Sequence, residues 1–280
     1  MARRPKPYYD RPSPNNGATM KILRPALKLV CLLPLLALPA VAQEEAPPPD
    51  NNLSDTINAN EYEACMTLAQ RSPAEAYGSA KTWSEKGGGA AALQCGAFAL
   101  INMNKPKEGA QMMELAAAKE EKPALKAALF GQAGQAWSMA NDTTRALNAQ
   151  NEALALAPDN VDLLVDRAFS YRDQDDFRSA MADLDRAHEL APERADILAY
   201  RASAWRFLKD NVKALADADA ALTLDPENPE ALLERGIIKR LTNDPEGARA
   251  DWMQVVALAG GTPTGDAAKA NLAKLAEKAN

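Results

Sequence analysis

Several kinds of residue recur at one fixed spacing of 34 positions between residues 137 and 255. Prolines end an apolar stretch at Pro158, Pro192 and Pro226. The other series with this step are the aspartates Asp142, Asp176, Asp210 and Asp244, the small residues Ala146, Ala180, Ala214, Ala248, Ala153, Ala187, Ala221 and Val255, and the aromatic residues Trp137, Tyr171 and Trp205. Because different residue types share one period, this part of the chain consists of copies of one structural unit.

Each unit is predicted to contain two helices joined by a short turn. The recurring aspartate starts the second helix, where its carboxylate accepts hydrogen bonds from the unpaired amides of the first turn. The recurring alanines let the two helices cross closely, and the proline ends the unit. In its period and in these residue types the pattern resembles the tetratricopeptide repeat. The resemblance implies an all-α, right-handed α-solenoid in which the first helices line a concave groove.

The predicted solenoid covers residues 57–262 and ends in a capping helix within 263–280. A capping helix is expected because each repeat buries an apolar face of its neighbour. The last repeat has no such neighbour, so its apolar face needs to be covered by a helix whose outer side is polar. On this helix, predicted from Asp266 to Ala279, the apolar stripe is Leu272, Leu275 and Ala276. The six predicted repeats are 57–90, 91–126, 127–160, 161–194, 195–228 and 229–262, of which the first two keep the pattern least well.

Residues 20–42 have the layout of a secretory signal. A basic flank precedes an apolar stretch at 29–38, and a small-x-small pattern ends at Ala42, near which cleavage is expected. A membrane anchor needs about 20 apolar residues, and this shorter stretch is interrupted by prolines. Residues 1–42 are therefore predicted to be an N-terminal extension and signal peptide, with translation starting at Met1 or Met20.

The mature chain is predicted to be an acidic protein of the periplasm or of the secreted fraction. Residues 43–56 are acidic and rich in proline, which predicts a disordered linker. The whole chain has a net charge of -6, and removal of residues 1–42 leaves 25 basic against 37 acidic side chains, or -12. This charge argues against nucleic acids and anionic membrane surfaces as partners, and no stable membrane insertion is expected after cleavage.

Two cysteines remain in the mature chain. Cys31 leaves with the signal, so that Cys65 and Cys95 form an even pair in an oxidising compartment. In the register of the repeats both lie on first helices of adjacent units. We expect a disulfide between them, and two separate buried thiols are the alternative.

Two charged series also follow the repeat. Arg167, Arg201 and Arg235 are each followed, at one constant separation, by an aspartate, and these aspartates are Asp183, Asp217 and Asp251. The third unit has alanine at both matching positions, which favours pairing of the arginine and aspartate within one unit. We interpret these residues as ion pairs that hold two helices together, rather than as a binding site.

A second arginine series points to a binding groove. Arg172, Arg206 and Arg240 lie near the ends of first helices, at positions where the resemblance implies ligand contacts. Arginine near a helix C-terminus also complements the helix dipole, so that this structural role is weighed equally. An arginine row beside an apolar strip suits an extended acidic segment with a bulky apolar anchor. The predicted groove residues are Phe169, Arg172, Arg206, Phe207, Ile237, Arg240 and Leu241.

No residue set in the sequence indicates catalysis, a metal or a cofactor. The single histidine, His188, lies on a second helix just before a terminating proline, where a role in catalysis is not expected. Two cysteines are too few for a metal site, and the triple glycine at 87–89 lacks the preceding strand of a phosphate-binding loop. The chain is therefore predicted to be no enzyme and to need no cofactor.

The predicted function is that of a scaffold which binds a protein or peptide partner in its concave groove. The main alternative is a self-associating architectural protein of the cell envelope, whose groove is filled by its own linker. An enzyme acting on envelope polysaccharide and a receptor for a small anion are minor alternatives. The sequence does not indicate the partner or the oligomeric state.

Overall fold

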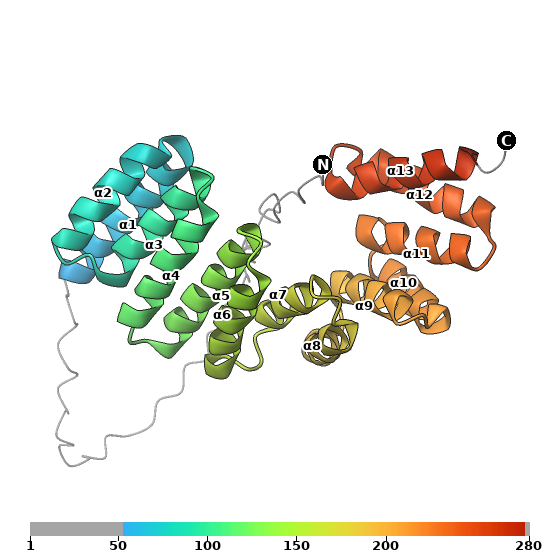
Figure 1. Cartoon of the computed structure of the whole chain (residues 1–280), viewed down its shortest axis with the longest axis horizontal. Coiled ribbons are helices and arrows are strands. Elements are labelled where there is room, and N and C mark those ends of the chain that lie inside the picture. Colours follow the sequence, from blue (N-terminus) through green and yellow to red (C-terminus); the bar gives the residue numbers. More distant parts are fainter. Residues whose placement is uncertain (1–52, 278–280) are drawn as a thin grey trace, which may run out of the picture. The chain divides into compact units, whose positions relative to one another are not determined.

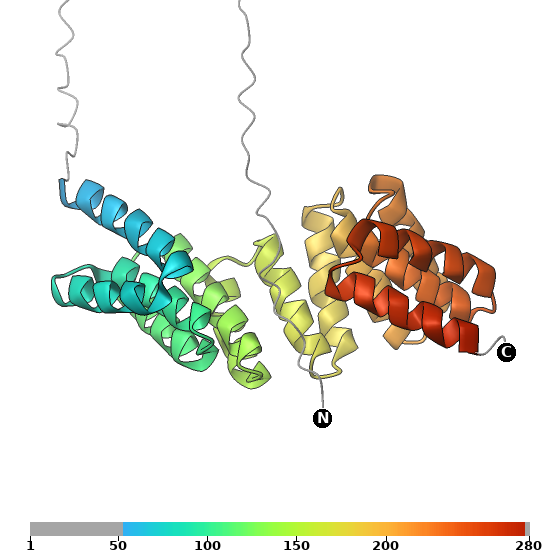
Figure 2. The ribbon, with the colours of Figure 1, turned by 90° about the horizontal axis from the view of Figure 1, so that it is seen from above.

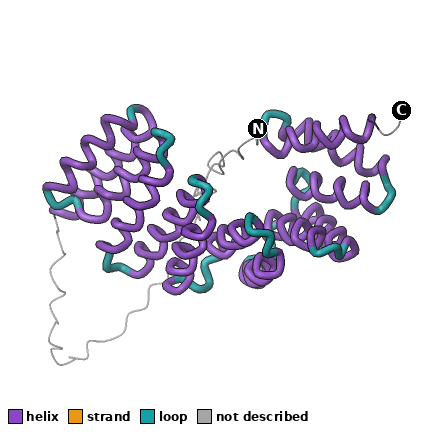
Figure 3. Tube along the Cα trace, in the orientation of Figure 1, coloured by secondary structure: helices purple, strands orange, loops and turns teal. Residues whose placement is uncertain are grey.

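The computed structural model describes residues 53–277, and over this range the chain is built from helices and loops (Figure 3). The signal peptide and most of the linker predicted from the sequence lie outside the described residues. The helices are α1 (Leu53–Arg71), α2 (Pro73–Glu85), α3 (Gly89–Asn102), α4 (Pro106–Lys119), α5 (Pro123–Met139), α6 (Thr143–Leu156), α7 (Val161–Arg172), α8 (Phe177–Leu190), α9 (Ala195–Phe207), α10 (Asn211–Leu224), α11 (Pro229–Leu241), α12 (Pro245–Ala259) and α13 (Pro263–Glu277).

The described helices form six hairpins followed by the single helix α13. From α2 onward each helix packs on the next, and the first helices α9 and α11 also contact each other (Figures 1 and 2). Pro158, Pro192 and Pro226 lie in the turns that join successive hairpins, at equivalent corners. The predicted all-α solenoid of helical hairpins is therefore confirmed. None of the described helices has both the length and the apolar character that crossing a membrane requires.

The second helices of the last four hairpins begin in the way that the sequence predicts. Asp142, Asp176, Asp210 and Asp244 each accept a hydrogen bond from the backbone N–H three residues later. Such a side chain satisfies an amide that has no partner within the helix, which typically stabilises a helix by about 1 kcal/mol. At the start of α2, in contrast, the side chain of Ser72 makes no cap hydrogen bond.

The residue before each of these aspartates adopts a left-handed backbone conformation. The φ angles are 58° at Asn141, 59° at Asp175, 66° at Lys209 and 67° at Asn243. Asparagine and aspartate tolerate this region better than other residues with a Cβ atom. The four residues keep the spacing of the repeat, so they close the same turn in four hairpins, and Lys209 is the least suited of them.

Small residues fill the close crossings between helices. Ala146, Ala214 and Ala248 are fully buried, and Ala180 is nearly so. Of the recurring aromatic residues, Trp137 is fully buried, whereas Tyr171 and Trp205 are partly buried. The period in the sequence therefore reflects packing, because a larger side chain at the alanine positions would separate the helices.

Some helix boundaries differ from those expected. Helix α1 begins at Leu53, within the segment predicted as linker, and Asp55 falls in its first turn, where acidic residues are favoured. Helix α5 begins at Pro123 rather than at Ala127, because proline is favoured in the first turn of a helix. On α13 Leu275 is buried and Leu272 is partly buried, but Ala276 is exposed, so that the predicted stripe is one residue too wide.

The three arginines of the first charged series bind the aspartates predicted for them. Arg167 contacts Asp183 through two nitrogens at 2.8 and 2.7 Å, and Arg235 contacts Asp251 at 2.9 and 2.8 Å. The hydrogen bonds to Asp183 and Asp251 raise the pKa of both guanidinium groups. Arg201 lies 3.4 Å from a carboxylate oxygen of its aspartate, as an ion pair without hydrogen-bond geometry.

Each of these arginines also contacts a residue of the preceding hairpin, which the sequence analysis did not predict. Arg167 donates to Asn151, Arg235 donates to Asp219, and Arg201 lies 3.2 Å from Asp185. The partners Asn151, Asp185 and Asp219 belong to the second helix of the preceding hairpin. We call the three groups of residues the arginine clamps, because each joins three helices from two successive hairpins.

The N-terminal hairpins are joined covalently. A disulfide links Cys65 of α1 to Cys95 of α3, with the two Cα atoms 6.1 Å apart. Both cysteines are buried in a cluster with alanines and Trp83. The bridge thus connects the first helices of two adjacent hairpins, as the sequence register predicts.

Candidate functional site

A small, mostly apolar cavity opens among the first helices α7, α9 and α11, with one wall from α8. Its volume is about 150 Å³. Its lining residues are Ala168, Phe169, Arg172, Phe177, Ala180, Leu184, Ala199, Tyr200, Ser203, Ala204, Glu230, Leu233 and Glu234. We call it the anchor cavity, and we call the surface formed by α5, α7, α9 and α11 the first-helix face.

Two pairs of aromatic rings shape the anchor cavity. Phe169 of α7 meets Tyr200 of α9 edge to face, with ring centroids 4.7 Å apart. Phe177 of α8 stacks on Phe207 at the end of α9, with centroids 4.3 Å apart. Phe207 is 45% exposed, so that this second pair extends the apolar lining to the protein surface. Aromatic pairs in these arrangements add stability beyond their buried area and hold the rings in place.

The charged groups beside the cavity are not equally available. Arg172 lies over the Phe169 ring at 4.8 Å, and its ion-pair partner is the adjacent Asp173, with both side chains about half exposed. Arg206 is bound at 2.7 and 3.1 Å by both carboxylate oxygens of Glu234, and these two side chains are only 16% and 14% exposed. Exposed ion pairs contribute little, so that Arg172 is the cation which is open to a ligand.

The seven predicted groove residues fall into three groups. Phe169 and Arg172 line the anchor cavity, and Arg206 and Phe207 border it through Glu234 and Phe177. The other three lie outside it: Ile237 is partly buried against the core cluster of α9–α13, and Arg240 and Leu241 are exposed at the end of α11. The three guanidinium groups therefore do not form one open row.

Neighbouring first helices are joined by a series of contacts that the sequence analysis missed. The contacting pairs are Gln94 with Gln132, Gln135 with Asp166, Phe169 with Tyr200, and Arg206 with Glu234. The second members occupy equivalent positions in successive repeats, so the repeat period marks this position. The residue type at this position differs from one repeat to the next, so a search for identical residues at the repeat spacing does not reveal it. The anchor cavity opens where the contacting pair is aromatic, at Phe169 and Tyr200.

Asp166 is the most perturbed carboxyl group on this face. Loss of hydration raises its pKa to about 6, the hydrogen bond from Gln135 opposes the shift, and the nearby Asp162 adds to it. The donated hydrogen bond is 2.7 Å long. A partner that excluded water from this carboxylate would raise its pKa further.

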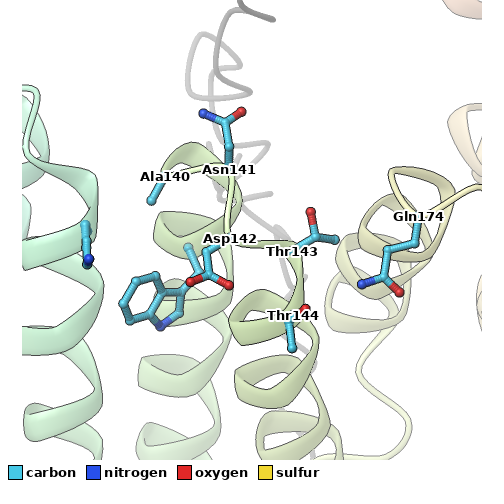
Figure 4. A pocket seen from close by; sticks show the side chains of 8 residues that line it. Ala140, Asn141, Asp142, Thr143, Thr144 and Gln174 are labelled. Carbon is cyan, nitrogen blue, oxygen red and sulfur yellow. The ribbon is translucent and has the colours of Figure 1, made fainter.

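A second hollow is larger but has different properties. It measures about 480 Å³ and surrounds the turn between α5 and α6, with Asn141, Asp142, Thr143 and Thr144 on one side and Gln174 facing them (Figure 4). Its polar groups already serve the fold, since Asp142 caps α6. Trp137, which also lines it, donates to Glu114 and lies under Arg145. This open polar surface offers no enclosed place for a ligand.

The described residues contain no group of three or more histidine, cysteine or acidic side chains placed to hold a metal ion. His188 is partly buried on α8, and its charged neighbour Asp217 has a pKa that burial raises and that Arg201 and His188 lower. Asp217 belongs to the arginine clamp of Arg201, and neither residue lines the anchor cavity.

Comparisons with known proteins agree with the repeat. A family model described as tetratricopeptide repeat matches residues 135–204. A comparison with curated protein sequences finds no match. Among solved structures, a fragment of MamA from Desulfovibrio magneticus RS-1 has 18% identity and a TM-score of 0.53, and the alignment covers 62% of this chain and 97% of that one.

Two further solved structures have a similar fold. PilF of Pseudomonas aeruginosa has 15% identity and a TM-score of 0.60, with 78% of this chain and 98% of that one covered. The C-terminal part of a repeat protein from Cytophaga hutchinsonii has 15% identity and a TM-score of 0.57, with 76% and 95% covered. At these identities the likeness shows a shared fold.

Proposed function

We propose that this chain, which matches the tetratricopeptide-repeat model over residues 135–204, is a non-catalytic scaffold that binds an extended segment of a protein partner on its first-helix face. The observation that carries the proposal is the anchor cavity, which three first helices and one second helix build together. Repeats create such extended binding surfaces because each contributes one element to a common face. Peptide grooves are typically apolar with a few charged groups that set orientation.

The proposed location is the periplasm or the secreted fraction. The signal layout of residues 20–42 supports it, with cleavage near Ala42. The disulfide between Cys65 and Cys95 is consistent with an oxidising compartment. Fractionation of cells that express the chain, followed by N-terminal sequencing of the mature form, tests this location.

The alternative of a groove filled by the protein's own linker has less support. Since α1 begins at Leu53, the segment available for this role shrinks to residues 43–52. That segment contains neither an aromatic residue nor a large aliphatic one. It therefore has no side chain of the size that the anchor cavity accepts.

Photo-cross-linking tests the binding face. A benzophenone amino acid replaces Leu241, which is 50% exposed at the end of first helix α11. The matched control places it at Met253, which is 60% exposed on second helix α12. We expect irradiation in an envelope extract to give a discrete adduct from position 241, which mass spectrometry then identifies. Equal adducts from both positions would contradict a specific first-helix face.

A further inference from the structure

We propose that the anchor cavity binds one aromatic side chain, of phenylalanine type, from a partner segment that carries a carboxylate next to this residue. The inference rests on the proposed function and deepens it, because it assigns the chemistry of the partner and the residues that recognise it. Three observations carry it: the size of the cavity, the geometry of its walls and the unequal state of the charges around it.

The size of the cavity limits the occupant to a single side chain. An apolar cavity of about 150 Å³ in a protein core is large enough to hold benzene, and the anchor cavity has this volume. A phenyl ring therefore fits, whereas a second large side chain does not.

The walls favour an aromatic occupant. The Phe169 and Tyr200 rings already meet edge to face at 4.7 Å, and Phe177 is fixed by its stacking on Phe207. A third ring can extend such a cluster with the edge-to-face contacts that aromatic groups prefer. Ala199 and Ala204, which also line the cavity, are buried, and their small side chains leave the space open.

The charges favour a carboxylate beside the ring. Glu234 is held by Arg206 through two hydrogen bonds and is largely buried, so that it attracts no further cation strongly. Glu230 accepts a hydrogen bond from Thr264 of α13 at 3.3 Å. Arg172, in contrast, lines the cavity with a half-exposed guanidinium, whose exposed neighbour Asp173 is a weak competitor. A guanidinium binds a carboxylate with two parallel hydrogen bonds.

Fluorescence anisotropy with labelled decapeptides tests the proposal on the purified chain. The reference peptide has one phenylalanine between two aspartates, and three matched peptides replace the phenylalanine by alanine, the aspartates by serine, or the aspartates by lysine. We expect loss of the ring to weaken binding about 10- to 100-fold, which corresponds to the burial of a phenylalanine. Serine should weaken it about threefold, as for an exposed ion pair, and lysine should weaken it more.

Variants of the chain locate the site. Ser203→Phe places a ring in the cavity and should weaken the binding of the reference peptide by the same factor of about 10- to 100-fold. Ser203→Leu should also weaken this binding. As the control, Met253→Phe places a ring at an exposed position of α12 outside the cavity lining and should bind the reference peptide normally. Arg172→Gln should abolish the preference for aspartate over serine, while the matched Arg240→Gln, an exposed arginine at the equivalent position two repeats later, should retain it. A thermal melt by circular dichroism checks that each variant is folded.

Each contrary outcome has a distinct meaning. Unchanged binding by a folded Ser203→Phe chain would overturn the cavity assignment, and tighter binding of the lysine peptide would overturn the carboxylate. If position 241 gives a specific cross-linked partner whose capture Ser203→Phe does not reduce, the anchor cavity is wrong while the scaffold function stands. If neither the peptides nor the cross-linker detect binding, both proposals fail.

Discussion

Replacement of Arg167 by methionine should destabilise the protein far more than the same replacement at Arg172. In the clamp, Arg167 makes two hydrogen bonds of 2.7 and 2.8 Å to Asp183, whose side chain is only 8% exposed. Methionine keeps the apolar stem of the side chain but removes the charge, so that a buried carboxylate loses its partner. At Arg172 the pair with Asp173 is about half exposed on both sides, and its loss should be almost neutral.

The magnitude follows from the burial of the two partners. Removal of one partner from a fully buried ion pair typically costs about 3–5 kcal/mol. Arg167 itself is 22% exposed, so water can reach the site and we expect about 2–3 kcal/mol, near the upper range for hydrogen bonds to charged groups. For a protein of this size such a change lowers the melting temperature by about 4–12 °C.

Urea unfolding followed by circular dichroism measures the effect. Because repeat arrays can unfold in stages, the first transition of each variant is compared with the same transition of the parent chain. The double variant Arg167→Met with Asp183→Leu should recover part of the loss, since no buried charge is left unpaired. A loss below about 0.5 kcal/mol, or one equal to that of Arg172→Met, would refute the reasoning.

Three further predictions concern other parts of the molecule. Burial raises the pKa of Asp166 to about 6, so the folded state binds its proton more tightly than the unfolded state and stability falls as the pH rises through 4 to 6. Asp166→Asn should therefore raise the free energy of unfolding on the order of 1–2 kcal/mol at pH 7.5 and little at pH 4, in paired urea titrations. Lys209→Gly should stabilise by about 0.5–1 kcal/mol, because glycine adopts a positive φ without strain; an unchanged melting temperature would count against this. Replacement of Cys65 and Cys95 by serine should lower stability by about 3–4 kcal/mol in the N-terminal hairpins, and hydrogen exchange should show the loss of protection confined to α1–α4.

The sequence predicts the fold well because packing and capping impose the same residue types on every repeat. Pro158 at a corner, Asp142 at a helix start and Ala146 at a crossing each perform one local task that recurs in the following unit. The forward pair of Arg167 with Asp183 was predicted for the same reason. Its contact with Asn151 of the preceding hairpin was missed. Asparagine stands there at the position that holds Asp185 and Asp219 in the next two repeats, so the three residues are not recognisable as one acidic series.

The site is less predictable because it depends on differences between repeats. Arg206 and Arg240 occupy equivalent positions, yet only Arg206 meets an acidic side chain, Glu234, on the next first helix. Phe177, which forms one wall of the anchor cavity, lies on a second helix, outside the first-helix pattern on which the groove prediction rests. The register places a side chain on a face, but its exposure depends on the residue that the neighbouring repeat brings against it.

The two ends of the helical stack are held by different chemistry, with a covalent sulfur bridge at α1 and α3 and guanidinium groups from α6 to α12. A thiol reductant would therefore loosen the first hairpins and leave the last ones intact. Rising ionic strength would instead act further along the chain, on the contacts of the guanidinium groups with the half-exposed Asp185 of α8 and Asp219 of α10. A reductant and a high salt concentration would thus weaken different parts of the array, the first acting among α1–α4 and the second on contacts among α8–α11, which include helices that line the anchor cavity.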